Sequence, residues 1–539
     1  MSDLKAGEPF GLEAASITRI NWELAVKRIV HDARSDFIYA PHLNFIYGRA
    51  SGELIRGLKA DLKAGTYSPG LPLTIEVPKS FRIAVATQIR RLGPNFSRPG
   101  SILLPRDRLL YQALADQAAP VIDARSDHAR SFSHKLDPAG GANMFLSTRS
   151  CWNALQKALK AHASNDDHLY VIKADVANYF GTLNQHELIN VLGDCGYPKP
   201  LHSRLEALLT SFTNDRSSRG ILQGMYPSDL FGNFYMAPID TMLKEFGVPS
   251  ARYVDDFYIF VENMSSAHRL LRELIPALRS YDLTLNEAKS KILPKSSLMA
   301  EEPDLEELFS DAVKEIAAQV DEDDFDVDYG FQTDWDDDAD ADEKLDLELA
   351  ATKVLFNSIE DYVGHEENIE RFCLPLFAKA NSDYAIEHVK DAFKKRPAMS
   401  QIFVAYLARF VASEDVHDFL FKLLVDKSLV DWQRMWVLAG LSQATSHDDE
   451  VVRAALEMFR DGHLHDALRA AAAIYVGRFG NHTRRKALIS LYGSTPPFIQ
   501  SAIYFSSRRW PGVERSNARA SWGNQNALNA LLTFAFGKK

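Results

Sequence analysis

The spacing of hydrophobic and polar positions changes partway along the 539-residue chain. Up to about residue 295, strand-like apolar runs bounded by turn residues alternate with amphipathic helical stretches, which is typical of a mixed α+β domain. Beyond residue 349 the strand signals fade, and apolar residues recur at helical spacing in 431–444, 449–462 and 466–480. The pattern therefore predicts an α+β domain over 1–295 and an all-α domain over 349–539.

The predicted helices of the second domain end near glycines or polar breaks, as stacked helix pairs do. Such pairs favour a HEAT-like α-solenoid, an architecture that usually presents a surface for a partner. The sequence shows no clean repeat period, so an ordinary helical bundle is the alternative interpretation.

A strongly acidic segment separates the two predicted domains. Residues 321–348 hold 15 acidic side chains and a single lysine, Lys344. Their charges repel one another and large apolar groups are few, so the segment is expected to be a linker or loop within a connecting region over 296–348. A second hypothesis is that it imitates nucleic acid and covers a basic channel.

The acidic segment also explains the net charge of the chain. The total is -11, and removing the segment's -14 leaves the other residues at +3, which is compatible with a nucleic-acid partner. Residues 79–108 hold seven Lys or Arg side chains against one acid, Asp107, although a basic run of this kind is usually a solvated face.

Cysteine content and hydropathy narrow the class of protein. Cys151, Cys195 and Cys373 lack the spacing of a zinc site or a disulfide framework and are expected to be packed thiols. No stretch approaches the roughly 20 unbroken apolar residues of a membrane helix, and the first residues lack the apolar core of a secretory signal. A cytoplasmic location without membrane association is the resulting expectation.

Two adjacent carboxylates, Asp255 and Asp256, form the main candidate for chemistry. They lie in the run Tyr253-Val254-Asp255-Asp256, with β-branched and aromatic residues on both sides, so the pair is predicted at the tight turn of a β-hairpin. Successive side chains of a strand point to opposite faces, and only a turn lets both carboxylates approach one point.

A third carboxylate, Asp175, follows the short β-rich run 169–172 by three residues and is predicted at the end of that strand. Alone it would more often be a helix cap or a turn residue. Together with the predicted hairpin it supplies the oxygen ligands that hold two Mg²⁺ ions about 3.5 to 4 Å apart in phosphoryl transfer. In such sites the protein mainly positions charge.

The order and spacing of these runs resemble the palm of a reverse transcriptase. ADVANYF (174–180) resembles the first catalytic motif, 219–236 the second, YVDD (253–256) the third and 283–292 the fourth, while 76–80 and 98–116 resemble the fingers. The resemblance covers about residues 35–295, and several motifs in one order are far more specific than any single motif.

The resemblance implies a magnesium site, with Mn²⁺ as an alternative ion. Asp175 and Asp255 correspond to the main metal ligands, Asp256 to a lesser one, and Val176 belongs to the same metal-binding set. Lys289 is the candidate proton donor to departing pyrophosphate, and an ordinary surface lysine is the alternative interpretation.

Five further positions correspond to substrate-binding residues of the family. Phe180 would crowd the sugar 2′ position and favour dNTPs over rNTPs, unless it is simply a core phenylalanine. Gln223 and Gly224 would lie against the incoming nucleotide, where glycine permits close backbone approach. Lys79 and Arg98 correspond to the fingers residues that bind the triphosphate.

Two features depart from the family pattern. The second motif commonly reads Ser-Pro, whereas here Ser228 is followed by Asp229, in a segment that helps to hold the template strand. The C-terminal part carries no recognisable RNase H carboxylate set and no zinc or maturase signature, so no thumb is identified.

A palm followed by a large helical domain resembles the bacterial defence-associated reverse transcriptases, including the abortive-infection enzymes. That group implies dNTP substrates, a DNA product, a homo-oligomer and, in some members, template-free synthesis primed on a protein tyrosine. Two alternatives stay open: a templated, retron-like enzyme that copies a dedicated noncoding RNA, and a non-catalytic nucleic-acid-binding scaffold. The retained carboxylates argue against the scaffold, because it has no need for clustered, costly charges.

Overall fold

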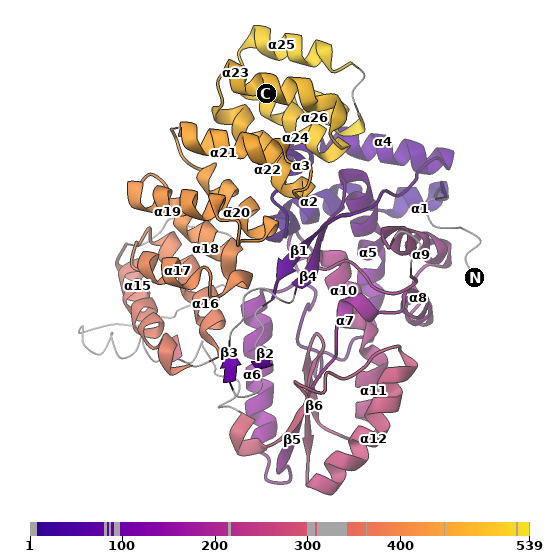
Figure 1. The fold of residues 1–539 in the computed structure, drawn as a ribbon. Coiled ribbons are helices and arrows are strands. Elements are labelled where there is room, and N and C mark those ends of the chain that lie inside the picture. The colour runs from indigo at the N-terminus through magenta and orange to yellow at the C-terminus, as the bar shows by residue number, and fades with distance from the viewer. Residues whose placement is uncertain are drawn as a thin grey trace.

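The computed structural model describes residues 8–79, 83–85, 88–90, 97–213, 217–298, 308–309, 342–362, 364–446, 448–523 and 526–537. These residues form an α+β part that ends with β8 and a helical part that begins with α15 (Asp342–Asn357) (Figure 1). The predicted change from mixed to helical structure is therefore confirmed. Most of the acidic segment lies outside the described residues, and its last residues belong to α15.

The described part of the chain begins with four α-helices, followed by four short strands. The elements are α1 (Ala14–Arg19), α2 (Trp22–Asp32), α3 (Pro41–Arg49), α4 (Ser51–Ala64), β1 (Leu73–Pro78), β2 (Ile83–Val85), β3 (Gln88–Arg90) and β4 (Ser97–Ile102). Strands β1 and β4 pair antiparallel, with Leu73 opposite Ile102 and Val77 opposite Arg98. The two fingers-like sequences thus meet in one ribbon.

The central sheet has the strand order β6-β7-β5-β8. Its strands are β5 (Tyr170–Asp175), β6 (Ser250–Tyr253), β7 (Asp256–Val261) and β8 (Lys291–Pro294). All neighbouring strands are antiparallel. Such a sheet can be joined by a tight hairpin, as β6 and β7 are, which confirms the hairpin predicted around the adjacent carboxylates.

Helices cover both faces of this sheet. The helices of the region are α5 (Pro105–Arg125), α6 (Thr148–Ala163), α7 (Tyr179–Thr182), α8 (Gln185–Asp194), α9 (Lys199–Phe212), α10 (Tyr226–Tyr235), α11 (Ala237–Glu245) and α12 (Met264–Ser280). Val171 and Phe260 pack with Leu155 of α6, whereas their neighbours Ile172 and Ile259 belong to the main core with Leu274 of α12. This alternation is the two-residue period of a sheet buried on both faces.

The C-terminal part is largely helical. Its helices are α15, α16 (Glu366–Lys379), α17 (Ile386–Ala392), α18 (Ser400–Leu407), α19 (Glu414–Val425), α20 (Asp431–Leu441), α21 (Asp449–Arg460), α22 (Asp466–Phe479), α23 (His482–Leu491), α24 (Pro497–Ser506), α25 (Gly512–Ser521) and α26 (Ala527–Gly537). The helices predicted at 431–444, 449–462 and 466–480 are confirmed as α20, α21 and α22. Alanine-rich α22 is buried nearly all round, between α20, α21 and α24; a solenoid arrangement stays a prediction.

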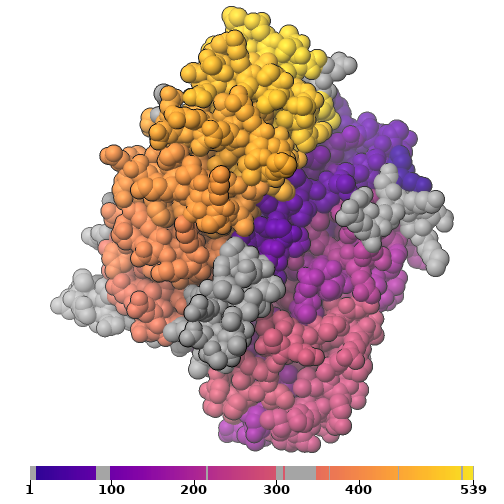
Figure 2. Space-filling view, viewed as in Figure 1, coloured from indigo at the N-terminus to yellow at the C-terminus, as the bar shows by residue number. Residues whose placement is uncertain are grey.

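The C-terminal helices contact the N-terminal part directly (Figure 2). Trp432 Nε1 donates a hydrogen bond of 2.8 Å to the Phe37 carbonyl, and His465 Nε2 donates one of 2.8 Å to the Thr74 carbonyl on β1. In both bonds a side chain of the helical part binds a backbone carbonyl far away in sequence. The helical part therefore helps to hold the fingers strands. Within the described residues, no helix is both long enough and apolar enough to span a membrane.

Candidate active site

The three predicted carboxylates lie at one end of the central sheet. Asp175, the last residue of β5, is directly opposite Asp256, the first residue of β7. Side chains opposite each other in an antiparallel pair share a face, with Cβ atoms about 4.5–5.5 Å apart. Asp255 precedes Asp256 in the turn between β6 and β7, so the fold brings all three carboxylates together.

The turn that carries Asp255 has an uncommon backbone conformation. Val254 has a φ of 54°, in the left-handed region where a β-branched residue is strained by about 1–3 kcal/mol. Two contacts hold it there: Ser133 Oγ accepts a hydrogen bond of 2.9 Å from the Val254 amide, and Arg252 donates one of 2.6 Å to the Val254 carbonyl. The side chains of Ser133 and Arg252 therefore hold the turn in this conformation.

Arg252 is itself held by a buried polar network. Its guanidinium is 2% exposed and bonds to Asp240 of α11, at 2.6 Å for the shortest contact. It also donates to the Asn233 side chain at 2.9 Å, which in turn accepts from Ser133 Oγ at 2.9 Å. The carboxylate hairpin is thus supported by one hydrogen-bonded network, which consists of Arg252, Asp240, Asn233 and Ser133. Sequence reasoning missed this support, because no local pattern links residues so far apart.

The carboxylates repel one another. Burial, followed by the charges of Asp256 and Asp175, raises the pKa of Asp255 to about 7. Lys289 partly offsets this charge, since its ammonium donates a hydrogen bond of 3.0 Å to Asp175 Oδ1. Burial works to lower the pKa of Lys289, but the bond to Asp175 and the nearby carboxylates outweigh it and raise that pKa. Lys289 is therefore a protonated cation at the site, as a proton donor has to be.

The donor set fits a divalent cation of the magnesium type. Clustered carboxylate oxygens with excess negative charge suit hard cations, and after burial the charges of Asp256 and Asp175 contribute to the raised pKa of Asp255. Among the described residues no group of three His, Cys, Asp or Glu side chains is already arranged as a metal cage, and the Lys289 ammonium bonds to one candidate ligand. Val176 is 2% exposed, so an apolar residue there can offer only its backbone carbonyl.

Phe180 lies against a glycine of α10. A Cβ at Gly232 would lie 2.7 Å from Phe180 Cε1, so only glycine leaves space for the ring. Neighbouring Tyr179 donates a hydrogen bond to the Gly232 carbonyl, which positions the pair Tyr179-Phe180 after Asp175. The ring of Phe180 is half-buried and packs against the main core. Its role toward the sugar stays a prediction.

Gly224 of the second motif contacts Phe37, a residue that sequence reasoning did not select. Gly224 has a φ of 79°, and a Cβ there would lie 2.5 Å from the Phe37 ring, so both backbone and space require glycine. Its neighbour Gln223 is half-buried. The guanidinium carbon of Arg98 lies 5.3 Å from the centre of the same ring. Phe37 therefore joins the second motif to the fingers.

The two predicted triphosphate-binding cations lie near one another. Burial and the charges of Arg98 and Lys289 lower the pKa of Lys79, against the opposite effect of Asp255 and Asp175. The pKa of Arg98 is lowered by burial and then by Arg371 of α16. Lys79 is thus within electrostatic reach of the carboxylates, and Arg98 faces the C-terminal helices.

Asp229, the departure in the second motif, lies in a poorly compensated setting. Burial and the charge of Asp32 raise its pKa well above the usual range. The closest cationic candidate, His134 Nε2, is 3.9 Å away, but burial lowers the pKa of His134 to about 4, so the imidazole is neutral at pH 7. A proline at position 229 would place no charge here.

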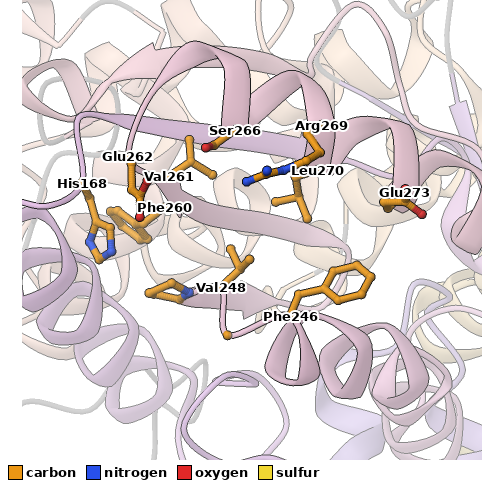
Figure 3. A pocket seen from close by; sticks show the side chains of 12 residues that line it. His168, Phe246, Val248, Phe260, Val261, Glu262, Ser266, Arg269, Leu270 and Glu273 are labelled. Carbon is orange, nitrogen blue, oxygen red and sulfur yellow. The ribbon is translucent and has the colours of Figure 1, made fainter.

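A separate cavity of about 660 Å³ lies at the other end of β7 (Figure 3). Phe246, Phe260, Glu262 and Arg269 are among its lining residues. Phe260 lies four residues along the strand from Asp256, or roughly 13 Å at the usual rise per residue. The cavity is therefore distinct from the carboxylate site.

Residues 95–300 match the model of the reverse transcriptase family, described as RNA-dependent DNA polymerase. The matched stretch includes all three carboxylates, Phe180 and the Gln223-Gly224 pair. The chain therefore contains a reverse transcriptase domain, and this domain implies RNA-directed DNA polymerase activity.

Solved structures with distant similarity include three telomerases. The telomerase of Candida albicans in complex with a TWJ fragment of telomeric RNA is 11% identical, with a TM-score of 0.29, and the match covers 66% of each chain. The corresponding complex from Candida tropicalis is 13% identical, with a TM-score of 0.29 and coverage of 69% of this chain and 68% of that one. Apo telomerase from the same species is 12% identical, with a TM-score of 0.30 and coverage of 73% and 71%. No curated protein matches the chain.

Proposed function

We propose that the chain is a magnesium-dependent DNA polymerase of the reverse transcriptase family that acts in antiphage defence. The observation that carries the polymerase chemistry is the cross-strand pair Asp175–Asp256 with Asp255 in the adjacent turn. Divalent cations held by these carboxylates would supply activation of the attacking hydroxyl and stabilisation of the leaving pyrophosphate. Three domains at 1–295, 296–348 and 349–539 are part of this proposal.

The chain's own groups have separate tasks in the reaction. Lys289, protonated and bonded to Asp175, donates a proton to departing pyrophosphate. The ring of Phe180 overlaps with a ribose 2′ hydroxyl and so selects dNTPs. Lys79 and Arg98 bind the triphosphate, where the planar guanidinium suits paired hydrogen bonds to phosphate oxygens.

Template-free, protein-primed synthesis in a homo-oligomer is the finer part of the proposal. It is supported by the replacement of the family's proline by Asp229 in the template-holding motif, where burial raises the pKa of the carboxyl well above its usual range. The large helical C-terminal part supports the defence role, since it resembles that of the abortive-infection enzymes. A retron-like enzyme would instead need a dedicated noncoding RNA.

Incubation of the pure protein with Mg²⁺ and each dNTP in turn, without added nucleic acid, tests the proposal. We expect DNA that remains covalently attached to the protein. Synthesis only after a template is added, or RNA recovered with the purified protein, would support the retron-like alternative. Absence of product with every template and primer would contradict the polymerase function in this chain.

A paired substitution makes the test specific to the carboxylates. Asp255→Ala with Asp256→Ala should abolish dNTP incorporation and leave the fold intact. Asp166 and Asp167, an exposed adjacent pair just before β5, provide the matched control, and their double alanine variant should incorporate dNTPs normally. Normal extension by the first variant would rule out the assigned site.

A further inference from the structure

Three arginines gather where the end of α22 meets the 3₁₀ turn η7 (Ser507–Arg509). Arg478 is near the end of α22, and Arg508 and Arg509 lie in the turn; we call these three the arginine cluster. Trp510 Nε1 donates a hydrogen bond of 2.9 Å to the Gly477 carbonyl. A Cβ at Gly477 would lie 2.1 Å from Ser506 Oγ, so glycine permits the close approach of the two segments.

Aromatic rings and backbone hold two of the three arginines in position. The Arg508 guanidinium carbon lies 3.4 Å from the ring centre of Phe505 and 5.4 Å from that of Phe45 on α3. Arg478 lies over Phe479 at 4.7 Å and donates a hydrogen bond of 2.5 Å to the Ser442 carbonyl. Ring stacking orders a guanidinium without neutralising it, so Arg478 and Arg508 are held in place but still charged, and Arg509 is exposed beside them.

The charges of the cluster are not balanced by acids. Among the described residues, no carboxylate forms a salt bridge with any of the three, whereas nearby Arg485 bonds to Glu514 at 2.7 Å. Burial, followed by the charges of Arg509 and Arg478, lowers the pKa of Arg508 to about 10. Like cations held together in this way are stabilised when an anion binds between them.

The cluster is linked to the active site through the N-terminal segment before α3. The Tyr39 ring is 6.1 Å from that of Trp436 on α20, and the charges of Arg478 and Arg508 act on the Tyr39 hydroxyl. Phe37, two residues earlier, contacts Gly224 and lies under Arg98. Phe37 and Tyr39 thus connect Arg98 to the cluster among the C-terminal helices.

We propose that Arg478, Arg508 and Arg509 bind the phosphodiester backbone of single-stranded nucleic acid that extends from the polymerase site. The occupant rests on the proposed function, which supplies a growing strand. Guanidinium groups bind phosphate oxygens by paired hydrogen bonds, and clustered positive charge along the backbone binds single strands without sequence preference.

Binding of fluorescent oligo(dT) and oligo(U), without Mg²⁺ and dNTPs, tests the cluster separately from catalysis. The triple variant Arg478→Gln, Arg508→Gln, Arg509→Gln should bind roughly tenfold more weakly at physiological salt. The slope of log Kd against log salt should fall by about 2, since each lost phosphate contact contributes about 0.7 for single strands. The stronger of the two ligands identifies DNA or RNA as the occupant.

The control removes the same number of charges elsewhere. Arg269, Arg453 and Arg460 are exposed, and the variant with glutamine at all three should bind like the wild-type protein. Equal weakening in both variants, or wild-type binding by the cluster variant, would overturn the proposal. A cluster variant with three lysines, which keeps charge without the planar fork, should bind with intermediate affinity, and thermal unfolding shows that each variant is folded.

The proposed function and the proposed strand-binding site can then be disproved independently. If the wild-type protein binds both oligonucleotides through the cluster but makes no DNA under any condition, the proposed function is wrong and the binding site stands. If DNA is made while the cluster variant binds and extends it to the same product length, the further inference is wrong and the polymerase stands.

Discussion

The carboxylate hairpin and the arginine cluster both hold like charges close together, negative in one and positive in the other. Burial, followed by the charges of Asp256 and Asp175, raises the pKa of Asp255, and burial, followed by the charges of Arg509 and Arg478, lowers the pKa of Arg508. Arg108 is a buried charge with partners of opposite sign, since it bonds to Asp32 at 2.9 Å and Asp36 at 2.6 Å. Matched pairs therefore serve the fold, and unmatched like charges indicate where ligands of opposite charge bind.

Neutralising one carboxylate should separate activity from stability. Asp255→Asn should reduce dNTP incorporation by roughly a thousandfold, because a metal ligand is lost. The same variant should have a higher Tm than the wild-type protein at pH 7.5 without Mg²⁺, since the repulsion that raises the pKa of Asp255 is removed. Calorimetry with and without Mg²⁺ checks this, and a variant that unfolds at lower temperature would contradict it.

Breaking a matched pair should have the opposite effect on stability. Arg252→Met leaves Asp240 buried without its partner and should destabilise the protein by about 3–5 kcal/mol. Adding Asp240→Leu to the variant should restore much of the loss, because the unpaired charge is removed as well. Denaturant unfolding measures both variants; equal stability of the single variant and the wild-type protein would disprove the structural role of the pair.

Phe180, an uncharged residue of the candidate active site, should affect only the selectivity between dNTPs and rNTPs. Phe180→Ala removes the ring that is seated against Gly232 and should let the enzyme use rNTPs, with discrimination between sugars reduced by roughly tenfold or more. Competition between dCTP and rCTP during synthesis measures the ratio. Phe180→Tyr, which keeps the ring, is the control, and unchanged discrimination in the alanine variant would refute the role of Phe180.

The smallest expected effect concerns Asp229 and depends on pH. Because its pKa is raised in the folded protein, Asp229 favours folding below its unfolded pKa, and this contribution is lost as pH rises through the folded value. The asparagine of the Asp229→Asn variant cannot ionise. The Tm of this variant should therefore exceed that of the wild-type protein by a margin that grows from pH 4 upward. The corresponding difference in the free energy of unfolding should be on the order of 1 kcal/mol. A difference that is constant with pH would contradict this assignment.

The hairpin and the carboxylates could be predicted because they depend on local sequence. A two-residue turn between β-rich runs defines the Asp255-Asp256 hairpin, and helical spacing defines α20 to α22. Their meeting with Asp175 followed from the order of the motifs.

Residues that act across the fold could not be predicted. Phe37, Arg252 and the arginine cluster carry no motif, and each acquires its role from contacts with segments distant in sequence. The matched or unmatched state of a charge is likewise visible only when its three-dimensional neighbours are known, since composition counts Arg478 and Arg485 alike.

The hydrogen bond from Trp432 to the Phe37 carbonyl connects α20 to the residue whose ring packs against Gly224. Phe37 fills the space that a glycine leaves at position 224, so the ring cannot shift toward the second motif without a clash. Any force that displaces α20 acts on the same backbone. A displacement of the helical part is thereby transmitted to the backbone of the second motif.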